Sequence, residues 1–161
     1  MRDNRGVSTK RSTPVLDDVA KTIIEQLQQD GRRSYAEIAK VVGLSEAAVR
    51  QRVQKLTEAG VMQIVTVTDP LQVGFARQAM IGIKVTGDTR KVVEALNALP
   101  SVIYVVLTAG SFDVLAEVLC GDDDELIDIL NSEIRALEGV ASTETFVYLK
   151  LGKQQYTWGT R

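Results

Sequence analysis

The chain has 161 residues, of which 45% are hydrophobic and 25% charged, a composition ordinary for a globular protein of one domain or two small ones. It contains no His and a single cysteine, Cys120, which excludes a disulfide framework and argues against a zinc site of His and Cys. The lack of His also removes the usual general base near neutral pH. We therefore expect no enzyme, no catalytic residue, no cofactor and no metal.

The net charge of −2 hides an asymmetry along the chain. Residues 1–60 hold eleven Lys and Arg against eight Asp and Glu, whereas residues 61–161 hold eight against thirteen. A basic front half and an acidic back half predict two modules with different partners. No apolar run reaches the ~18 residues of a membrane helix, and no signal-peptide pattern opens the chain, so a cytoplasmic location is expected.

The first predicted helix follows a polar, basic segment over residues 1–12, which we expect to be a flexible arm. Thr13 is the expected N-cap of this helix, and Pro14 is suited to its first helical position. Apolar residues then recur at helical spacing until Gly31. Residues 13–60 are predicted to form one small helical domain.

Two further helices follow within that domain. Ser34 and Glu37 have the spacing of a capping box, which predicts a helix that starts after Ser34. Gly43 is expected to end it, because glycine adopts a positive φ without strain. Ser45 is the predicted cap of the third helix, and Gly60 the residue that ends it.

The second and third helices predict a helix-turn-helix. Four apolar side chains are expected where these helices press together, namely Ile38, Val42, Leu44 and Val49. Residues 32–56 also contain six basic residues against two acidic ones. Such a motif places its second helix in the major groove while basic side chains bind phosphate, so we predict binding to double-stranded DNA. The alternative is an ordinary three-helix packing motif with no role in DNA binding.

Base recognition is expected from exposed residues early in the third helix. Arg50 is suited to guanine and Gln51 to adenine in the major groove. Arg52 has two interpretations, a DNA contact or packing along its own helix that stabilises the domain. Ser34 is a phosphate candidate, although capping already explains it. The predicted DNA contacts are Ser34, Ser45, Glu46, Ala47, Ala48, Arg50, Gln51, Gln54 and Lys55, the last two to phosphate.

The second half of the chain predicts a different architecture. A loose strand over residues 61–68 and a linker that extends to residue 76 lead into residues 77–150, where strand and helix patterns alternate. The expected strands are 79–85, 102–108, 113–119 and 140–149, and the expected helices are 89–99 and 122–137. This order predicts a ferredoxin-like βαββαβ domain, an antiparallel sheet with helices on one face. The tail, residues 151–161, has no assignment.

The fold class is therefore α+β, with an N-terminal helix-turn-helix (winged-helix-like) domain and a C-terminal ferredoxin-like domain. One face of the predicted sheet is fully apolar, and the other is too apolar to face bare solvent. One face is expected to carry Ile81, Ile83, Val85, Ile103, Val105 and Leu107, and the other Met80, Gly82, Lys84, Tyr104 and Val106. A sheet with helices on one side should be polar on the other. We infer that a partner covers the second face, most simply a second copy of the same sheet, which makes a homodimer.

The loop at residues 110–113 has two interpretations. It is either a tight hairpin, in which Gly110 supplies the turn conformation and Asp113 bonds its own loop, or a ligand pocket. In a pocket, Asp113 would bind a ligand's ammonium group and the loop amides its carboxylate. The acidic run at residues 122–125 does not fit a calcium loop, and the dipole of the following helix explains it without a metal. Cys120 is expected to be an inert thiol.

This ordered set of motifs resembles the Lrp/AsnC family, the feast/famine transcription regulators of bacteria and archaea. The resemblance covers residues 14–150. It rests on Leu16-Asp17, Asp30-Gly31-Arg32, Ala36-Glu37-Ile38-Ala39, Val42-Gly43-Leu44-Ser45, Val49, Arg52-Val53, Leu56 and Gly60-Val61. In the second half, Gly110-Ser111-Phe112-Asp113 is similar to the signature hairpin loop of the family's effector domain.

The resemblance implies dimers that form through the ferredoxin-like domains and assemble further, often into octamers. It also implies a small effector, usually an amino acid, bound between dimers near the hairpin loop. The implied effector residues are Thr108, Ala109, Gly110, Ser111, Phe112 and Asp113. A two-fold dimer predicts a roughly palindromic DNA site.

Two other functions are the alternatives to an effector-responsive regulator. An architectural DNA-binding protein that ignores effectors would look almost identical. Siroheme decarboxylases resemble the same two-domain architecture, but their activity is associated with His residues, which this chain lacks.

Overall fold

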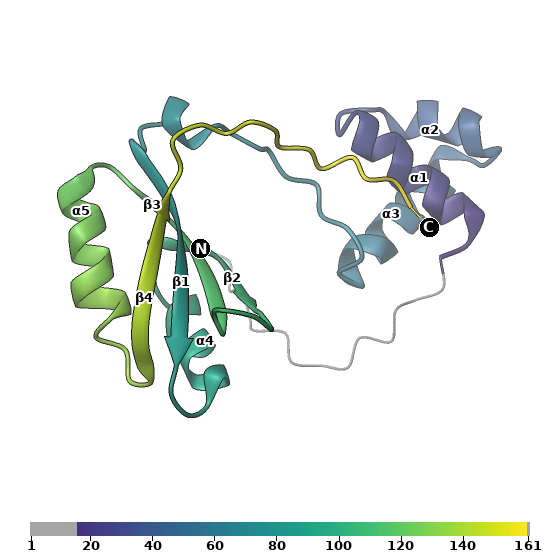
Figure 1. The fold of residues 1–161 in the computed structure, drawn as a ribbon. Helices are drawn as coiled ribbons and strands as arrows, with labels where there is room; N and C mark the ends of the chain where they lie inside the picture. Colours follow the sequence, from purple (N-terminus) through teal and green to yellow (C-terminus); the bar gives the residue numbers. More distant parts are fainter. Residues whose placement is uncertain (1–15, 161) are drawn as a thin grey trace. The chain divides into compact units, whose positions relative to one another are not determined.

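The computed structural model describes residues 16–160, which separate into two compact units (Figure 1). The helical unit comprises described residues up to Val67 together with the tail from Gly152. The sheet unit comprises residues 68–151. The arm predicted over residues 1–12 lies outside the described residues, as do Thr13 and Pro14.

Helix α1 (Asp18–Gln29) starts later than predicted. Asp17 is its N-cap, and the side chain of Asp17 accepts a hydrogen bond from the backbone N–H of Ala20 at 2.7 Å. The predicted start at Pro14 is therefore wrong. A carboxylate at the N-cap satisfies an otherwise unpaired N–H and faces the positive end of the helix dipole.

Helices α2 (Tyr35–Val42) and α3 (Glu46–Glu58) form the predicted helix-turn-helix. The capping box of Ser34 and Glu37 is present, and Gly43 has a φ of 69°, as the tight turn requires. Ile38 and Val49 are fully buried between the helices. Leu44 is 36% exposed, so its predicted place in this contact is wrong.

The sheet unit has the predicted ferredoxin-like arrangement. Its strands are β1 (Arg77–Val85), β2 (Val102–Leu107), β3 (Val114–Cys120) and β4 (Val140–Val147), and its helices include α4 (Thr89–Asn97) and α5 (Asp123–Asp128). The strands form one sheet in the order β2-β3-β1-β4, with antiparallel neighbours throughout. A short 3-10 turn, Pro70–Gln72, precedes β1.

The helix predicted over residues 122–137 is interrupted. After α5 the chain continues as a π-helical segment, Ile129–Ile134, in which the N–H of Arg135 reaches the carbonyl of Leu130. Both Ile129 and Ile134 are buried in the core of the sheet unit. The wider turn of a π-helix lets side chains five residues apart share one face, which the α-helical period of the prediction does not allow.

The core of the sheet unit lies between the helices and one face of the sheet. Ala79, Ile81 and Ile83 of β1 are fully buried against this core, together with Val114, Ala116 and Val118 of β3. Strand β2 departs from the prediction, because Ile103 is 51% and Leu107 53% exposed. The ladder with β3 shifts its register between Val102 and Tyr104. This bulge breaks the alternation at Ile103, and β2 is an edge strand with less cover.

The strand predicted over residues 61–68 is absent. No ladder pairs this segment within the described chain, and its apolar side chains are open to solvent, with Ile64 51%, Val65 66% and Val67 54% exposed. An alternating pattern needs a neighbouring strand to become a strand, and this chain supplies none there. Within residues 16–160, no helix is both long and apolar enough to cross a membrane.

Candidate nucleic-acid interface and effector loop

The start of α3 presents a set of exposed side chains. Ser45 caps the helix through the N–H of Ala48, and Glu46 begins it. Arg50 lies one turn further on, where a guanidinium nitrogen is 2.6 Å from a carboxylate oxygen of Glu46. The Arg50 guanidinium also lies over the ring of Tyr35, 5.2 Å from its centroid. These two partners hold a positive charge at the exposed start of the predicted recognition helix.

The remaining predicted contacts on α3 differ in their surroundings. Gln51 is exposed, and Gln54 donates a hydrogen bond to Glu58 at 2.8 Å. Ala47 is exposed, whereas Ala48 is half-buried. Lys55 lies further along the helix, where it lines a shallow groove that also includes residues at the start of α1. The structure therefore brings the first half of the set together and separates Lys55 from it.

Arg52 is bonded inside the helical unit. Its guanidinium donates to the carboxylate of Asp17 at 2.7 Å and so ties α3 to the N-cap of α1. The hydrogen bond from Arg52 is the main reason that the pKa of Asp17 is lowered, with the N–H of Ala20 next. Of the two interpretations of Arg52, this contact matches the one in which it stabilises the domain.

Ser34 is occupied by its capping role. Its hydroxyl donates to Glu37 at 2.8 Å and accepts from the N–H of Glu37 at 3.2 Å, while its own N–H donates to the same carboxylate. These bonds from Ser34 lower the pKa of Glu37. A phosphate at this position would therefore have to share the hydroxyl with the capping box.

The loop that precedes β3 is pinned to β1 and not only to itself. The N–H of Asp113 donates to the carbonyl of Ile83 at 3.0 Å, and the N–H of Val85 donates to Oδ2 of Asp113 at 2.9 Å. Within the loop, the Thr108 hydroxyl donates to the carbonyl of Phe112 at 2.6 Å. Ala109, Gly110 and Ser111 are exposed above these anchors.

Gly110 does not have the role that the hairpin interpretation gave it. Its φ is outside the positive range, and an added Cβ would meet nothing within 4 Å. The carboxylate of Asp113 likewise accepts from the N–H of Val85 in β1, and not from its own loop as the hairpin interpretation has it. The ladder between β1 and β3 ends at the pair of Ile83 and Val114, so the N–H of Val85 has no ladder partner on that side and is available to the carboxylate.

Phe112 belongs to the open face of the sheet, opposite the helices. A Cβ on Gly82 would lie 2.7 Å from the Phe112 ring, so only glycine lets the ring rest on β1. Phe112 also meets Phe146 edge to face, with ring centroids 6.0 Å apart. A glycine inside a strand often marks such a close approach, a signal that was present in the sequence. We did not predict the roles of Gly82 and Phe146.

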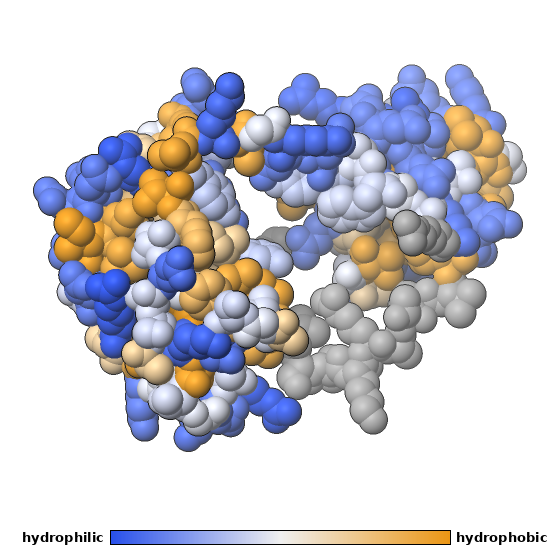
Figure 2. Space-filling view, viewed as in Figure 1, coloured by the Kyte–Doolittle hydropathy of each residue, from blue (hydrophilic) through white to orange (hydrophobic). Residues whose placement is uncertain are grey.

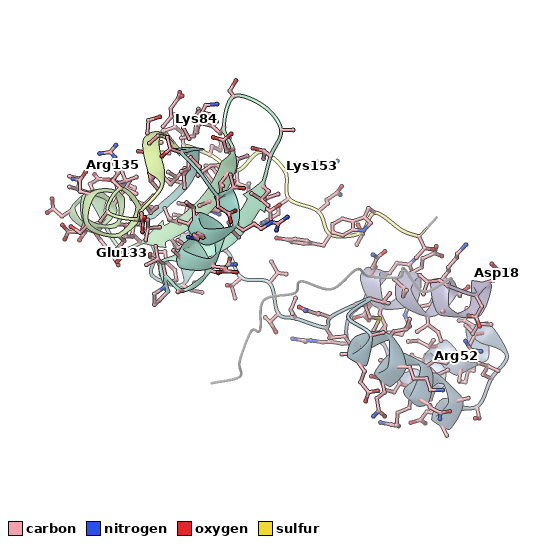
Figure 3. The ribbon with its side chains drawn as sticks, turned by 90° about the horizontal axis from the view of Figure 1, so that it is seen from below. Asp18, Arg52, Lys84, Glu133, Arg135 and Lys153 are labelled. Atoms are coloured by element: carbon pink, nitrogen blue, oxygen red, sulfur yellow. The ribbon has the colours of Figure 1, made fainter. Side chains whose placement is uncertain are left out.

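The open face is largely apolar, and Figure 2 shows apolar side chains exposed on the sheet unit. Tyr104 is 51% and Phe146 45% exposed, and Met80 is half-buried beside Phe146. Lys84 (Figure 3) lies on the same face, between Ile83 and Val85, the two residues that bond Asp113. The inference that this face needs a cover therefore rests on observed exposure as well as on pattern.

A polar cluster interrupts this face. Gln78 donates to the Glu117 carboxylate at 2.7 Å, and Tyr148 lies beside the same carboxylate. Burial, the charge of Glu117 and the hydrogen bond between them raise the pKa of Tyr148 to about 12.

Three of the four acidic residues at 122–125 have partners within the described chain. Asp122 caps α5 through the N–H of Glu125, Asp123 pairs with Arg77, and Glu125 accepts from the N–H of Gly121. Among residues 16–160, no group of three or more His, Cys, Asp or Glu is arranged to hold a metal. Cys120 is buried, and its burial raises the pKa of its thiol.

Comparison with known proteins matches both units. Residues 16–57 match the AsnC-type helix-turn-helix domain, and residues 75–161 match a C-terminal dimeric alpha+beta barrel domain of AsnC-type regulators. The HTH-type transcriptional regulator FL11 of Pyrococcus furiosus is 35% identical over 142 residues, which cover 87% of this chain and 93% of FL11. The regulatory protein AsnC of Escherichia coli is 30% identical over 139 residues, 84% of this chain and 91% of AsnC.

Solved structures agree with these matches. The structure of E. coli AsnC superposes with a TM-score of 0.77 at 28% identity, and the match covers 88% of this chain and 97% of AsnC. The transcriptional regulator NMB0573 of Neisseria meningitidis, solved as a complex with L-Met, has the same fold, with a TM-score of 0.77 at 22% identity over 88% of this chain and 95% of that one.

The fold and the helix-turn-helix thus define a DNA-binding transcription regulator with a separate α+β assembly domain. The chain belongs to the Lrp/AsnC family.

Proposed function

We propose that the chain is a cytoplasmic transcription regulator whose assembly or DNA binding responds to a small effector, an amino acid, bound between dimers at residues 108–113. The dimers form through the open sheet faces, assemble into an octamer and bind a roughly palindromic DNA site. The effector site is inferred from the position of Asp113. Its Oδ2 accepts a hydrogen bond from the N–H of Val85 in β1, while residues 109–111 of the same loop are exposed.

DNA recognition falls to the first half of α3. Arg50 reads guanine and Gln51 reads adenine, and the neighbouring predicted residues lie along the same groove. To reach a base, Arg50 gives up its ion pair with Glu46 and bonds the base in its place. This exchange costs little, because both side chains are at least half exposed and an exposed pair contributes only about 0–1 kcal/mol. Gln54 and Lys55 contact phosphate.

The effector site uses the two oxygens of Asp113 differently. Oδ2 keeps the hydrogen bond from the N–H of Val85, and Oδ1 accepts a hydrogen bond from the ammonium group of the amino acid. The exposed backbone N–H groups of Ala109, Gly110 and Ser111 receive the ligand carboxylate. The relative of similar fold from N. meningitidis, solved with L-Met, supports an amino acid as the ligand class.

The test is a titration of the twenty amino acids against the purified chain, with thermal stability and DNA affinity as readouts. A ligand at a hundred times its dissociation constant should add about 2.7 kcal/mol to the free energy of unfolding. Asp113→Asn should lose this response, because an amide still accepts from Val85 but carries no charge for the ammonium. Asp124→Asn, at an exposed position of α5, is the matched control and should respond like the wild type.

A flat result for every compound would contradict the effector site. The chain would then be an architectural DNA-binding protein, provided that it still binds DNA.

A further inference from the structure

The C-terminal tail belongs spatially to the helical unit, although it follows the last strand of the sheet unit. Residues 152–160 group with the three helices. The backbone N–H of Gly159 donates to Oε1 of Gln28 at 3.1 Å, and the hydroxyl of Thr160 donates to Oε1 of Glu25 at 2.6 Å. Figure 1 shows this end of the chain beside α1. The chain therefore passes between the sheet unit and the helical unit twice, once before β1 and once after β4.

The contact is confined to the last described residues. Gly159 and Thr160 are half-buried, as are Glu25 and Gln28, whereas residues 152–158, including Lys153, are exposed (Figure 3). Gly159 has a φ of 74°, which strains any other residue, although an added Cβ would meet nothing within 4 Å. Its glycine is therefore needed for the turn that directs the terminal bonds toward α1.

The tail leaves the predicted DNA-binding surface uncovered. Glu25 and Gln28 lie three residues apart on one side of α1, away from the buried stripe of Ile23 and Leu27. Neither of the two bonds involves α3. A docked tail therefore restrains the helical unit but leaves the exposed start of α3 free to bind DNA.

We propose that the tail is a releasable strap, which docks on α1 and limits the positions that the DNA-binding unit reaches from the sheet unit. Two hydrogen bonds at a partly exposed site hold a tail only weakly, and ordering the tail opposes them. A contact this weak opens and closes at equilibrium, so the strap is releasable. This inference does not depend on the effector site.

Trp158 provides a direct probe, because it is the only tryptophan in the chain and lies next to Gly159. Time-resolved fluorescence anisotropy of the full-length protein therefore reports on the tail alone. The docking variant combines Gln28→Ala with Thr160→Val, which removes both acceptor and donor. The control variant combines Gln29→Ala with Thr157→Val, the same changes at exposed neighbouring positions. Circular dichroism melting checks that both variants fold.

We expect Trp158 of the docking variant to lose most of the slow anisotropy component that reports tumbling with the helical unit, because a free terminus moves within nanoseconds. The control should keep it. An identical decay in the two variants would show that α1 does not hold the tail.

The consequence for DNA is measured on a site selected from random sequence by the wild-type chain. About five base pairs inserted between the half-sites turn them to opposite sides of the duplex. The wild type and the control should lose more affinity on this site than the docking variant does. Equal losses for all three, with a freed Trp158, would show that the contact does not restrain the DNA-binding unit and would overturn the strap.

Discussion

The exposed side of α3 and the open face of the sheet both lack a protein partner in one chain, but their chemistry is opposite. On α3, charged and amide side chains bond one another, as Arg50 does with Glu46 and Gln54 with Glu58. On the sheet, Phe146 and Tyr104 are left about half exposed. Exposed polar pairs are easily exchanged for a charged partner such as DNA. An apolar face gains free energy only when a partner removes it from water.

The difference indicates that the helical unit is stable without its binding partner, whereas the sheet unit needs a partner to cover its open face. The helical unit has its own buried core and keeps a polar surface that is stable without its partner. The sheet unit has a full core on one face only, and residues 75–161, which include this unit, match a domain described as a dimeric barrel. A variant on the sheet should therefore change assembly and stability, whereas a variant on α3 should change only DNA binding.

The largest effect is expected at Gly82. Gly82→Ala places a Cβ 2.7 Å from the Phe112 ring, so the ring must leave the open face. Such overpacking costs about 1–3 kcal/mol and should also weaken the dimer. Light scattering gives the mass, and thermal melting gives the stability. Gly110→Ala is the matched control, because its Cβ meets nothing within 4 Å. If Gly82→Ala has the mass and melting temperature of the wild type, the open face is not part of the dimer interface.

A smaller effect, confined to DNA, is expected at Arg50. Arg50→Ala should weaken binding to the selected site by about 1–3 kcal/mol if the side chain reads a base. Melting should change little, because Arg50 is exposed. Fluorescence titration against selected and random DNA separates the two roles. Arg90→Ala removes the same charge from an exposed position of α4 and should have no specific effect. If affinity falls equally for selected and random DNA, Arg50 contacts only phosphate and reads no base.

The smallest effect concerns the polar cluster on the open face. Tyr148, with a pKa of about 12, should ionise after an ordinary tyrosine with a pKa near 10. Because the folded pKa is the higher one, the stability that Tyr148 contributes is complete below pH 10 and is lost as the pH rises toward 12.

Glu117→Gln tests the cause of this shift by absorbance near 295 nm. The variant should lower the pKa of Tyr148 but leave it above 10, because burial is the larger cause and remains. Glu94→Gln, at an exposed position of α4, is the control. A Tyr148 pKa unaffected by Glu117→Gln would mean that burial alone sets it.

Much of the candidate DNA interface was predictable because its geometry is local. The Ser34 capping box, the Gly43 turn and the Ser45 cap each depend on residues at most four positions apart. The sequence leaves two interpretations of Arg52, because its partner Asp17 lies 35 residues away and is brought close only when α1 packs on α3. The loop residues 110–113 were predicted by their motif, but their anchoring to β1 was not.

The sequence by itself determined the helix-turn-helix and the order of strands and helices, since caps, glycine turns and apolar periods act over a few residues. The tertiary structure alone decided where the long-range partners meet. It set the bulge that exposes Ile103, the bond from Val85 to Asp113, and the bond between Gly159 and Gln28, 131 residues apart. The physical reason is that such contacts have no local signal: the chain must first close the loops between them, and many side chains can make the same bond.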